Sequence, residues 1–160
     1  MTSRFLVRAA VYAALYAALT LAPGLNALAY GQVQFRVSEA LMIFACFDPA
    51  AVLGLTVGTA IANLGSPMMP VDTVVGAALT LLAAAIMYAI GPRVVALVAP
   101  VVVNAFGVAA MLALLLELPY WASVAWVGIG EAAVLFTLGL ALFLAVRRHR
   151  EVFGLTRPVA

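Results

Sequence analysis

One carboxylate of this sequence lies deep inside an apolar stretch. Glu131 stands in the segment Tyr120–Val146, roughly 16 Å from its nearer end at about 1.5 Å of helix per residue. A carboxylate at the centre of a bilayer costs about 2.5–3.5 kcal/mol on insertion scales, so we treat it by default as part of a functional site. Glu131 is therefore the first candidate for contact with a ligand.

Other polar residues fall toward the same side of the membrane as Glu131 once the spans are laid out. They come from the first long loop, from the outer ends of spans and from the middle of one span: Gln34, Arg36, Glu39, Asn63, Asp72 and Asn104. The inner half of the bundle is almost purely apolar. These positions predict a polar cup that is open to the outside and closed toward the cytoplasm, and we take them as candidate substrate-binding residues.

Two of these candidates also have a structural interpretation. Glu131 could instead be a structural carboxylate bonded to Asn104 or to a backbone group, although we favour ligand contact, and Asn104 could form a hydrogen bond that joins two helices. The small residues Gly128 and Gly130 leave room beside Glu131 for either a ligand or a close helix.

The loop residues have a second interpretation as well. Gln34, Arg36 and Glu39 are compatible with a solvated loop that holds an exposed ion pair, which would contribute little stability. The loop Gly24–Val37 is also long enough to act as a lid over the cup, as mobile loops of binding proteins commonly do.

The composition identifies an integral membrane protein. The chain of 160 residues is 68% hydrophobic and 9% charged, and its mean hydropathy is +1.22. Soluble domains are nearer 45–50% apolar and about 25% charged. We expect one membrane domain over residues 1–160. The single cysteine, Cys46, excludes a disulfide within the chain, and the net charge of +2 is no sign of nucleic-acid binding.

Apolar runs bounded by turn residues predict an all-α bundle of six transmembrane helices. A crossing needs about 20 residues, so the second and third helices form a short pair. Pro100 is expected to kink the fifth. The expected ranges are Phe5–Pro23, Ser38–Phe47, Ala50–Leu64, Val71–Ile90, Val94–Leu116 and Tyr120–Val146.

The arginines predict the orientation. All eight basic residues are arginines, and with a cytoplasmic N-terminus every one except Arg36 falls on an inner segment. Such an excess of positive charge marks the cytoplasmic side of a membrane protein. An even number of spans then places both termini in the cytoplasm, and we expect a multi-pass protein of the plasma membrane.

Small residues recur at four-residue spacing on three helices and allow close helix approach in lipid. For the third and fourth helices we expect packing within the bundle. The first helix carries two neighbouring rows, which is more small surface than one partner needs, so we expect a second partner such as another subunit there. The rows of the first helix are Ala10, Ala14 and Ala18, and Ala9, Ala13 and Ala17.

No residue pattern in the sequence indicates an enzyme. The single histidine, His149, lies in the basic tail, which excludes a Ser-His or Cys-His nucleophile in the membrane. No His/Cys cluster offers a zinc site, and no glycine-rich phosphate loop is present. We therefore expect no enzyme, no metal and no cofactor, and no ATP hydrolysis by this chain.

Four motifs carry a resemblance to a known family. They are Gln34–Leu41 (QFRVSEAL), Gly58–Asn63 (GTAIAN), Val103–Ala105 (VNA) and Val127–Glu131 (VGIGE). In this order they resemble the QueT family, the S components of energy-coupling-factor transporters that take up queuosine precursors. The resemblance covers about Arg8 to Arg148, and its first and last motifs are the most specific.

The resemblance implies a six-helix S-component fold that works with a separate transmembrane T component and two ATPase subunits. It implies docking through the row Ala10, Ala14 and Ala18, and a 7-deazaguanine substrate. A carboxylate can accept two N–H donors from a guanine-like edge, so Glu131 and Glu39 are expected to share the substrate contacts. The alternatives are an S component for another small vitamin-like substrate and a structural membrane protein without a ligand.

Overall fold

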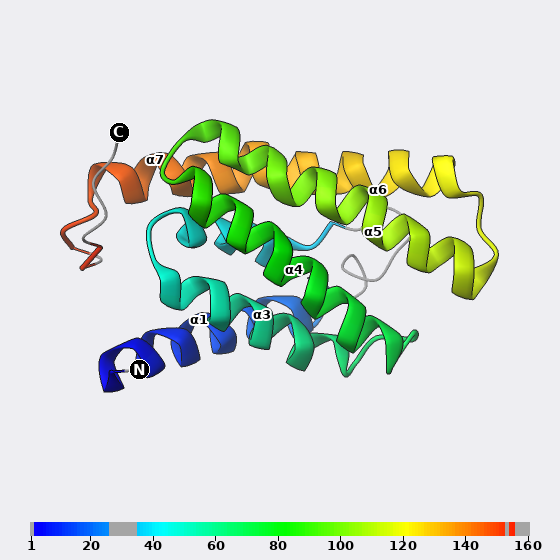
Figure 1. Ribbon diagram of the computed structural model, residues 1–160, viewed down its shortest axis with the longest axis horizontal. Helices are drawn as coiled ribbons and strands as arrows, with labels where there is room; N and C mark the ends of the chain where they lie inside the picture. Colours follow the sequence, from blue (N-terminus) through cyan, green and yellow to red (C-terminus); the bar gives the residue numbers. More distant parts are fainter. Residues whose placement is uncertain (1, 26–34, 153, 156–160) are drawn as a thin grey trace.

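The computed structural model describes residues 2–25, 35–152 and 154–155, and every regular element in these ranges is helical (Figure 1). The predicted all-α class is therefore confirmed. Most of the loop that we expected to act as a lid lies outside these ranges, and so does the candidate residue Gln34.

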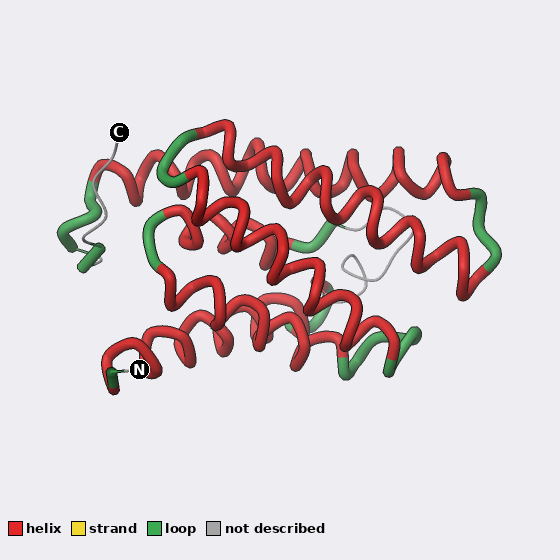
Figure 2. Tube along the Cα trace, viewed as in Figure 1, coloured by secondary structure: helices red, strands yellow, loops and turns green. Residues whose placement is uncertain are grey.

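The helices follow the predicted spans closely (Figure 2). Six of the elements are α-helices, whereas η1 and η2 are 3-10 helices and η3 is a single stretch of π-helix within the last span. In chain order the elements are α1 (Ser3–Leu21), η1 (Val37–Cys46), α3 (Pro49–Asn63), α4 (Val71–Ile90), η2 (Val94–Leu97), α5 (Val98–Leu116), α6 (Tyr120–Val134), η3 (Leu135–Gly139) and α7 (Leu140–Arg148).

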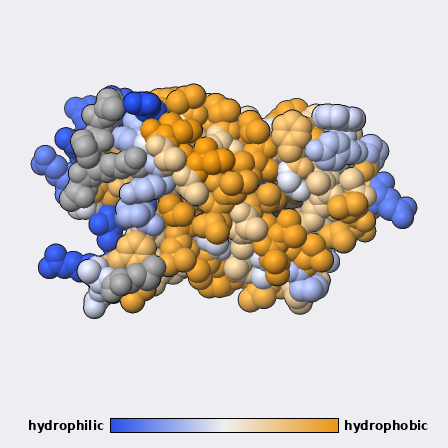
Figure 3. All heavy atoms as spheres, in the orientation of Figure 1, coloured by the Kyte–Doolittle hydropathy of each residue, from blue (hydrophilic) through white to orange (hydrophobic). Residues whose placement is uncertain are grey.

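Within the described part of the chain, four helical stretches are long and apolar enough to cross a membrane. They are Ser3–Leu21, Val71–Ile90, Val94–Leu116 and Tyr120–Arg148, and the short apolar helices η1 and α3 lie between the first two of them. Figure 3 shows hydrophobic side chains over the middle of the visible face and hydrophilic ones gathered toward the two ends. This pattern is the one expected of a bundle whose sides face lipid.

The bundle is elongated, and the start of α1 and the end of α7 lie at the same end (Figure 1). Neighbouring helices pack in chain order, with α1 against α3, α3 against α4, α4 against α5 and α5 against α6. The α3–α4 and α5–α6 connections lie at the opposite end from the termini (Figure 1). The polar residues predicted to form the outer cup belong mostly to that half.

The second segment differs from a short membrane helix. It is wound as 3-10 helix, which rises about 2 Å per residue and so covers more length than an α-helix of equal size. All its residues from Ser38 to Cys46 are buried, and it contacts helices of both halves of the bundle, namely α1, α3, α4, α6 and α7. The segment η1 therefore lies at the centre of the bundle, where other helices surround it.

The glycines of α3 are used for packing inside the bundle, as predicted. A Cβ atom on Gly58 would lie 2.8 Å from the backbone oxygen of Ala13, and one on Gly54 would collide with the backbone oxygen of Ala9. These contacts use the row Ala9, Ala13 and Ala17, which is buried. The row Ala10, Ala14 and Ala18 is exposed along the outer face of α1.

Pro100 is predicted to kink the fifth helix, but it lies close to the start of α5. The chain enters the fifth span as the 3-10 turn η2 and changes to α-helix at Val98. Pro100 therefore lies in the first turn of α5, where backbone N–H groups have no partner within the helix and proline is tolerated.

Candidate functional site

The first part of the site joins α1 to the start of η1. Tyr16 is fully buried and its hydroxyl donates to Oε1 of Glu39, which is also buried. One turn further along α1, the hydroxyls of Thr20 and Ser38 lie 2.6 Å apart. The polar face of α1 thus holds the first turn of η1, which carries Ser38 and Glu39 of the QFRVSEAL motif, against the interior of the bundle.

Arg36 immediately precedes η1 and is also buried. Its guanidinium interacts with the Tyr16 hydroxyl and with the carboxylates of Glu39 and Asp72. The interpretation of Arg36 and Glu39 as a solvated surface pair is therefore wrong. Only 8% of Arg36 and 1% of Glu39 is exposed, so their charges compensate one another inside the protein, where pairing matters most.

The second part joins the end of α3 to the start of α4. The side-chain amide of Asn63 donates to the backbone oxygen of Asp72 at 2.8 Å and to its Oδ1 atom at 3.2 Å. Gly76 lies beside this pair, and a Cβ atom there would collide with the Asn63 amide. Gly76 therefore clears space for this polar pair.

The third part joins α5 to α6. The amide of Asn104 donates to Oε1 of Glu131 at 2.7 Å, and both residues are buried. A Cβ atom on Gly128 would lie 3.5 Å from the Cβ atom of Ala105, an ordinary contact, so α6 and α5 would also have room for an alanine there. The π-helical stretch η3 begins four residues after Glu131, and such stretches are frequent at functional sites.

Electrostatic interactions between charged side chains link the three parts into one cluster. Glu131 interacts with both Glu39 and Arg36, and Arg36 in turn with Asp72. We call this set the outer polar cluster, after the side of the membrane on which the arginine pattern predicts it to lie; it contains Tyr16, Arg36, Glu39, Asn63, Asp72, Asn104 and Glu131. Every candidate binding residue that the structure describes belongs to it.

The outer polar cluster contains several buried oxygens that have no hydrogen-bond partner among the described residues. They are Oε2 of Glu39, Oδ1 of Asn63, Oδ2 of Asp72 and Oε2 of Glu131. Leaving such a buried group unpaired costs about 1–3 kcal/mol. All four atoms are acceptors, and each belongs to a residue whose other polar atom already bonds within the protein. The arrangement suits a ligand that is rich in hydrogen-bond donors.

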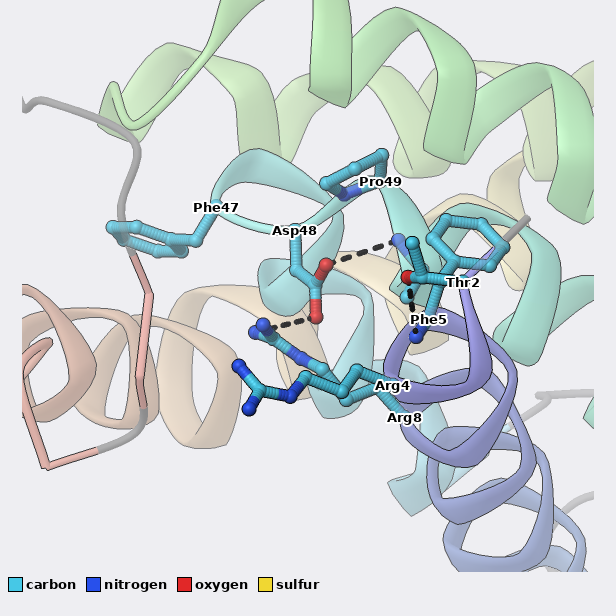
Figure 4. A pocket seen from close by; sticks show the side chains of 8 residues that line it. Thr2, Arg4, Phe5, Arg8, Phe47, Asp48 and Pro49 are labelled. Atoms are coloured by element: carbon cyan, nitrogen blue, oxygen red, sulfur yellow. Dashed lines mark hydrogen bonds and ion pairs between the residues drawn. The ribbon is translucent and has the colours of Figure 1, made fainter.

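A different polar group lies at the end of the bundle that carries the termini. There, Asp48 accepts from Arg8 at 2.7 Å, from the Tyr12 hydroxyl at 3.0 Å and from the backbone N–H of Ala50 at 3.0 Å. Asp48, Arg8 and Ala50 also line an open cavity of about 240 Å³ (Figure 4). Because Asp48 has a partner for each oxygen and caps α3, this group holds α1 and α3 together at that end of the bundle.

Two tyrosines of α1 take part in these polar groups although the sequence pattern did not predict it. Tyr12, Tyr16 and Thr20 are spaced by four residues on the buried face of α1, and each of their hydroxyls bonds either to η1 or to Asp48, the residue that caps α3. The signal was present in that spacing, because a hydroxyl within an apolar helix must find a partner inside the bundle.

Comparison with known proteins agrees with the motifs. The family profile described as QueT transporter matches residues 6–148. A protein of Lactococcus lactis subsp. cremoris named queuosine precursor transporter QueT is 45% identical over 76 residues, which cover 48% of this chain and 44% of the relative. The aligned part thus spans less than half of that relative. No solved structure matches this chain.

The family match runs from the second turn of α1 to the end of α7 and so includes all three parts of the outer polar cluster. It covers most of the chain. The apolar helices agree with a multi-pass membrane protein, and we conclude that this chain belongs to the QueT transporter family.

Proposed function

We propose that this protein is the substrate-binding S component of an energy-coupling-factor importer and captures a queuosine precursor, a 7-deazaguanine, from outside the cell. The support is its membership of the QueT transporter family and its similarity to a protein named as a queuosine precursor transporter. Membership of a transporter family also favours transport over catalysis.

The observation that carries the proposal is the set of unpaired acceptor oxygens in the outer polar cluster. The amino edge of a deazaguanine presents neighbouring N–H donors, which a carboxylate can accept in bidentate fashion. Glu131 and Glu39 both offer a free oxygen for such donors. The carboxylates of the cluster outnumber its single guanidinium, so an aminomethyl group with its positive charge would be attracted as well.

The proposal includes the orientation and the six-helix membrane arrangement. With the termini in the cytoplasm, the inner end carries Arg4, Arg8, Arg93, Arg147 and Arg148, while the outer polar cluster lies toward the outside. The elements η1 and α3 then serve as the short second and third membrane helices. The plasma membrane is the proposed location.

Energy must come from other subunits, since the chain has no phosphate-binding loop. We propose that a transmembrane T component and two ATPase subunits supply it. The T component would contact the exposed row Ala10, Ala14 and Ala18 on α1. Small exposed residues allow the close backbone approach on which helix association in lipid depends.

A ligand screen on the purified protein tests this function. Aminomethyl-7-deazaguanine should raise the unfolding temperature, because a ligand at 100 times its Kd stabilises by about 2.7 kcal/mol. Guanine and riboflavin should produce smaller shifts or none. A preference for riboflavin would favour an S component for another vitamin-like substrate. No shift with any compound would favour a structural membrane protein.

A further inference from the structure

Tyr16 occupies a position in the outer polar cluster that no motif or relative assigns. It is fully buried on α1, and its hydroxyl donates a hydrogen bond to Oε1 of Glu39. The other carboxylate oxygen, Oε2, has no hydrogen-bond partner among the described residues. We propose that Tyr16 is a positioning residue of the ligand site, which fixes Glu39 so that Oε2 is presented to the ligand. This inference rests on the proposed binding function.

The geometry favours positioning over mere packing. A glutamate side chain ends in a soft torsion that is roughly two-fold, so an unrestrained carboxylate would lose entropy when it meets a ligand. A phenol attached to a packed helix is a rigid anchor with few rotatable bonds. Tyr16 lies in the interior of α1, which packs against α3 and η1. Its hydroxyl therefore has a fixed place.

The partners of the phenol also agree with this role. The Tyr16 hydroxyl interacts with Arg36 and with the hydroxyl of Thr59 in addition to Glu39. A phenol oxygen can donate one hydrogen bond and accept others. It can therefore donate to the Glu39 carboxylate while it accepts from Arg36, since the Thr59 hydroxyl proton already goes to the backbone oxygen of Leu55. This arrangement fixes the distance between the positive and negative charges of the cluster.

Tyr12 provides an internal comparison. It lies one turn earlier on the same buried face of α1 and also donates to a carboxylate, that of Asp48. Asp48, however, is already paired with Arg8 and with the backbone N–H of Ala50. Removing the Tyr12 hydroxyl should affect the packing of the inner end, whereas removing the Tyr16 hydroxyl should affect the ligand site.

The test compares Tyr16→Phe with Tyr12→Phe, each of which removes one buried hydroxyl. We would measure the affinity of the purified full-length protein for aminomethyl-7-deazaguanine by titration calorimetry. Tyr16→Phe should weaken binding by roughly tenfold, the size expected for a hydrogen bond to a charged group. Tyr12→Phe should leave the affinity within about twofold, even where the two variants lose similar thermal stability.

A double-mutant cycle with Glu39→Gln shows whether Tyr16 acts through Glu39. If it does, adding Tyr16→Phe to Glu39→Gln should cost much less affinity than it costs in the wild-type protein, since contacting residues are not additive. Equal affinity of wild type and Tyr16→Phe would overturn the positioning role, and so would fully additive losses in the cycle. Failure of the wild-type protein to bind any deazaguanine would instead overturn the proposed function.

Discussion

The side-chain amide of Asn104 lies 2.7 Å from Oε1 of Glu131, which ties α5 to α6, while Oε2 of the same carboxylate has no hydrogen-bond partner among the described residues. The bond that the sequence suggested as a structural alternative is therefore present. It uses only Oε1, one of the two carboxylate oxygens. One side chain can join the two helices and still offer an acceptor to a ligand.

Glu131→Gln tests whether this carboxylate also accepts hydrogen bonds from the ligand. The substitution keeps an acceptor for Asn104 but replaces the other oxygen with an amide donor and removes the negative charge. Affinity for the deazaguanine should fall more than tenfold, or about 1.4 kcal/mol, with the protein still folded in detergent. Titration calorimetry measures this change in affinity.

Glu117→Gln is the matched control for this variant. Glu117 lies at the end of α5 and is exposed, so its loss of charge should leave affinity unchanged. If Glu131→Gln bound the ligand as tightly as this control does, Glu131 would be a structural residue only.

Gly76→Ala tests the clearance around the Asn63–Asp72 pair. The added methyl group would collide with the Asn63 amide, so the pair must move and its unpaired acceptors with it. We expect ligand affinity to fall several-fold, together with a loss of about 1–3 kcal/mol of stability, which is typical of an overpacked site. Thermal unfolding and binding calorimetry measure the two effects.

Gly128→Ala serves as the control for Gly76→Ala. Its methyl group would meet Ala105 at 3.5 Å, an ordinary contact, so both stability and affinity should stay near those of the wild type. A Gly76→Ala protein that behaves like Gly128→Ala would show that the Asn63–Asp72 pair is not confined as the structure describes.

The ends of the helices could be predicted because the chain marks them chemically. Gly91 follows the last residue of α4 with a positive φ of 82°, and Pro119 precedes α6. The central place of η1 could not be predicted in this way. A short apolar run bounded by polar residues has the same sequence pattern whether it faces lipid or lies among other helices.

The candidate site, like the fold, could be predicted only in part from the sequence. The type and depth of Glu131, Asn104 and Glu39 were enough to select them, since polar groups in lipid are costly. Their pairing was predictable only for Glu131 and Asn104, because it depends on which helices are neighbours. Tyr16 was missed because a tyrosine within an apolar helix contributes to the apolar pattern, while its hydroxyl matters only once a partner is known.

Ala14→Trp tests the exposed face of α1. Side chains two residues apart on a helix point about 200° apart, so Ala14 faces away from Tyr16 and the outer polar cluster. A bulky indole should block close docking of a T component without reaching the ligand. The variant should bind the deazaguanine normally, yet fail to co-purify with the T component and fail to support uptake.

Ala85→Trp on α4 is the control, since Ala85 is an exposed alanine on a different helix. It should assemble and transport normally. Normal uptake by the Ala14→Trp protein would mean that this face of α1 contacts lipid. Loss of ligand binding as well would indicate misfolding.

Labelling of single cysteines tests the orientation. The native Cys46 is buried and would first be replaced by alanine. In intact cells, a membrane-impermeant maleimide should label Glu117→Cys, at the end opposite the termini, and should label His149→Cys only after lysis. The reverse pattern would place the outer polar cluster on the cytoplasmic side and would contradict uptake from outside.

Equilibrium dialysis of labelled aminomethyl-7-deazaguanine against the purified full-length protein is the most direct test of the central claim. The outer polar cluster predicts saturable binding of one ligand per chain that excess unlabelled compound displaces and riboflavin does not. Absence of saturable binding, or binding that survives unchanged when Glu131 and Glu39 are both replaced by glutamine, would contradict the claim that this cluster is the substrate site.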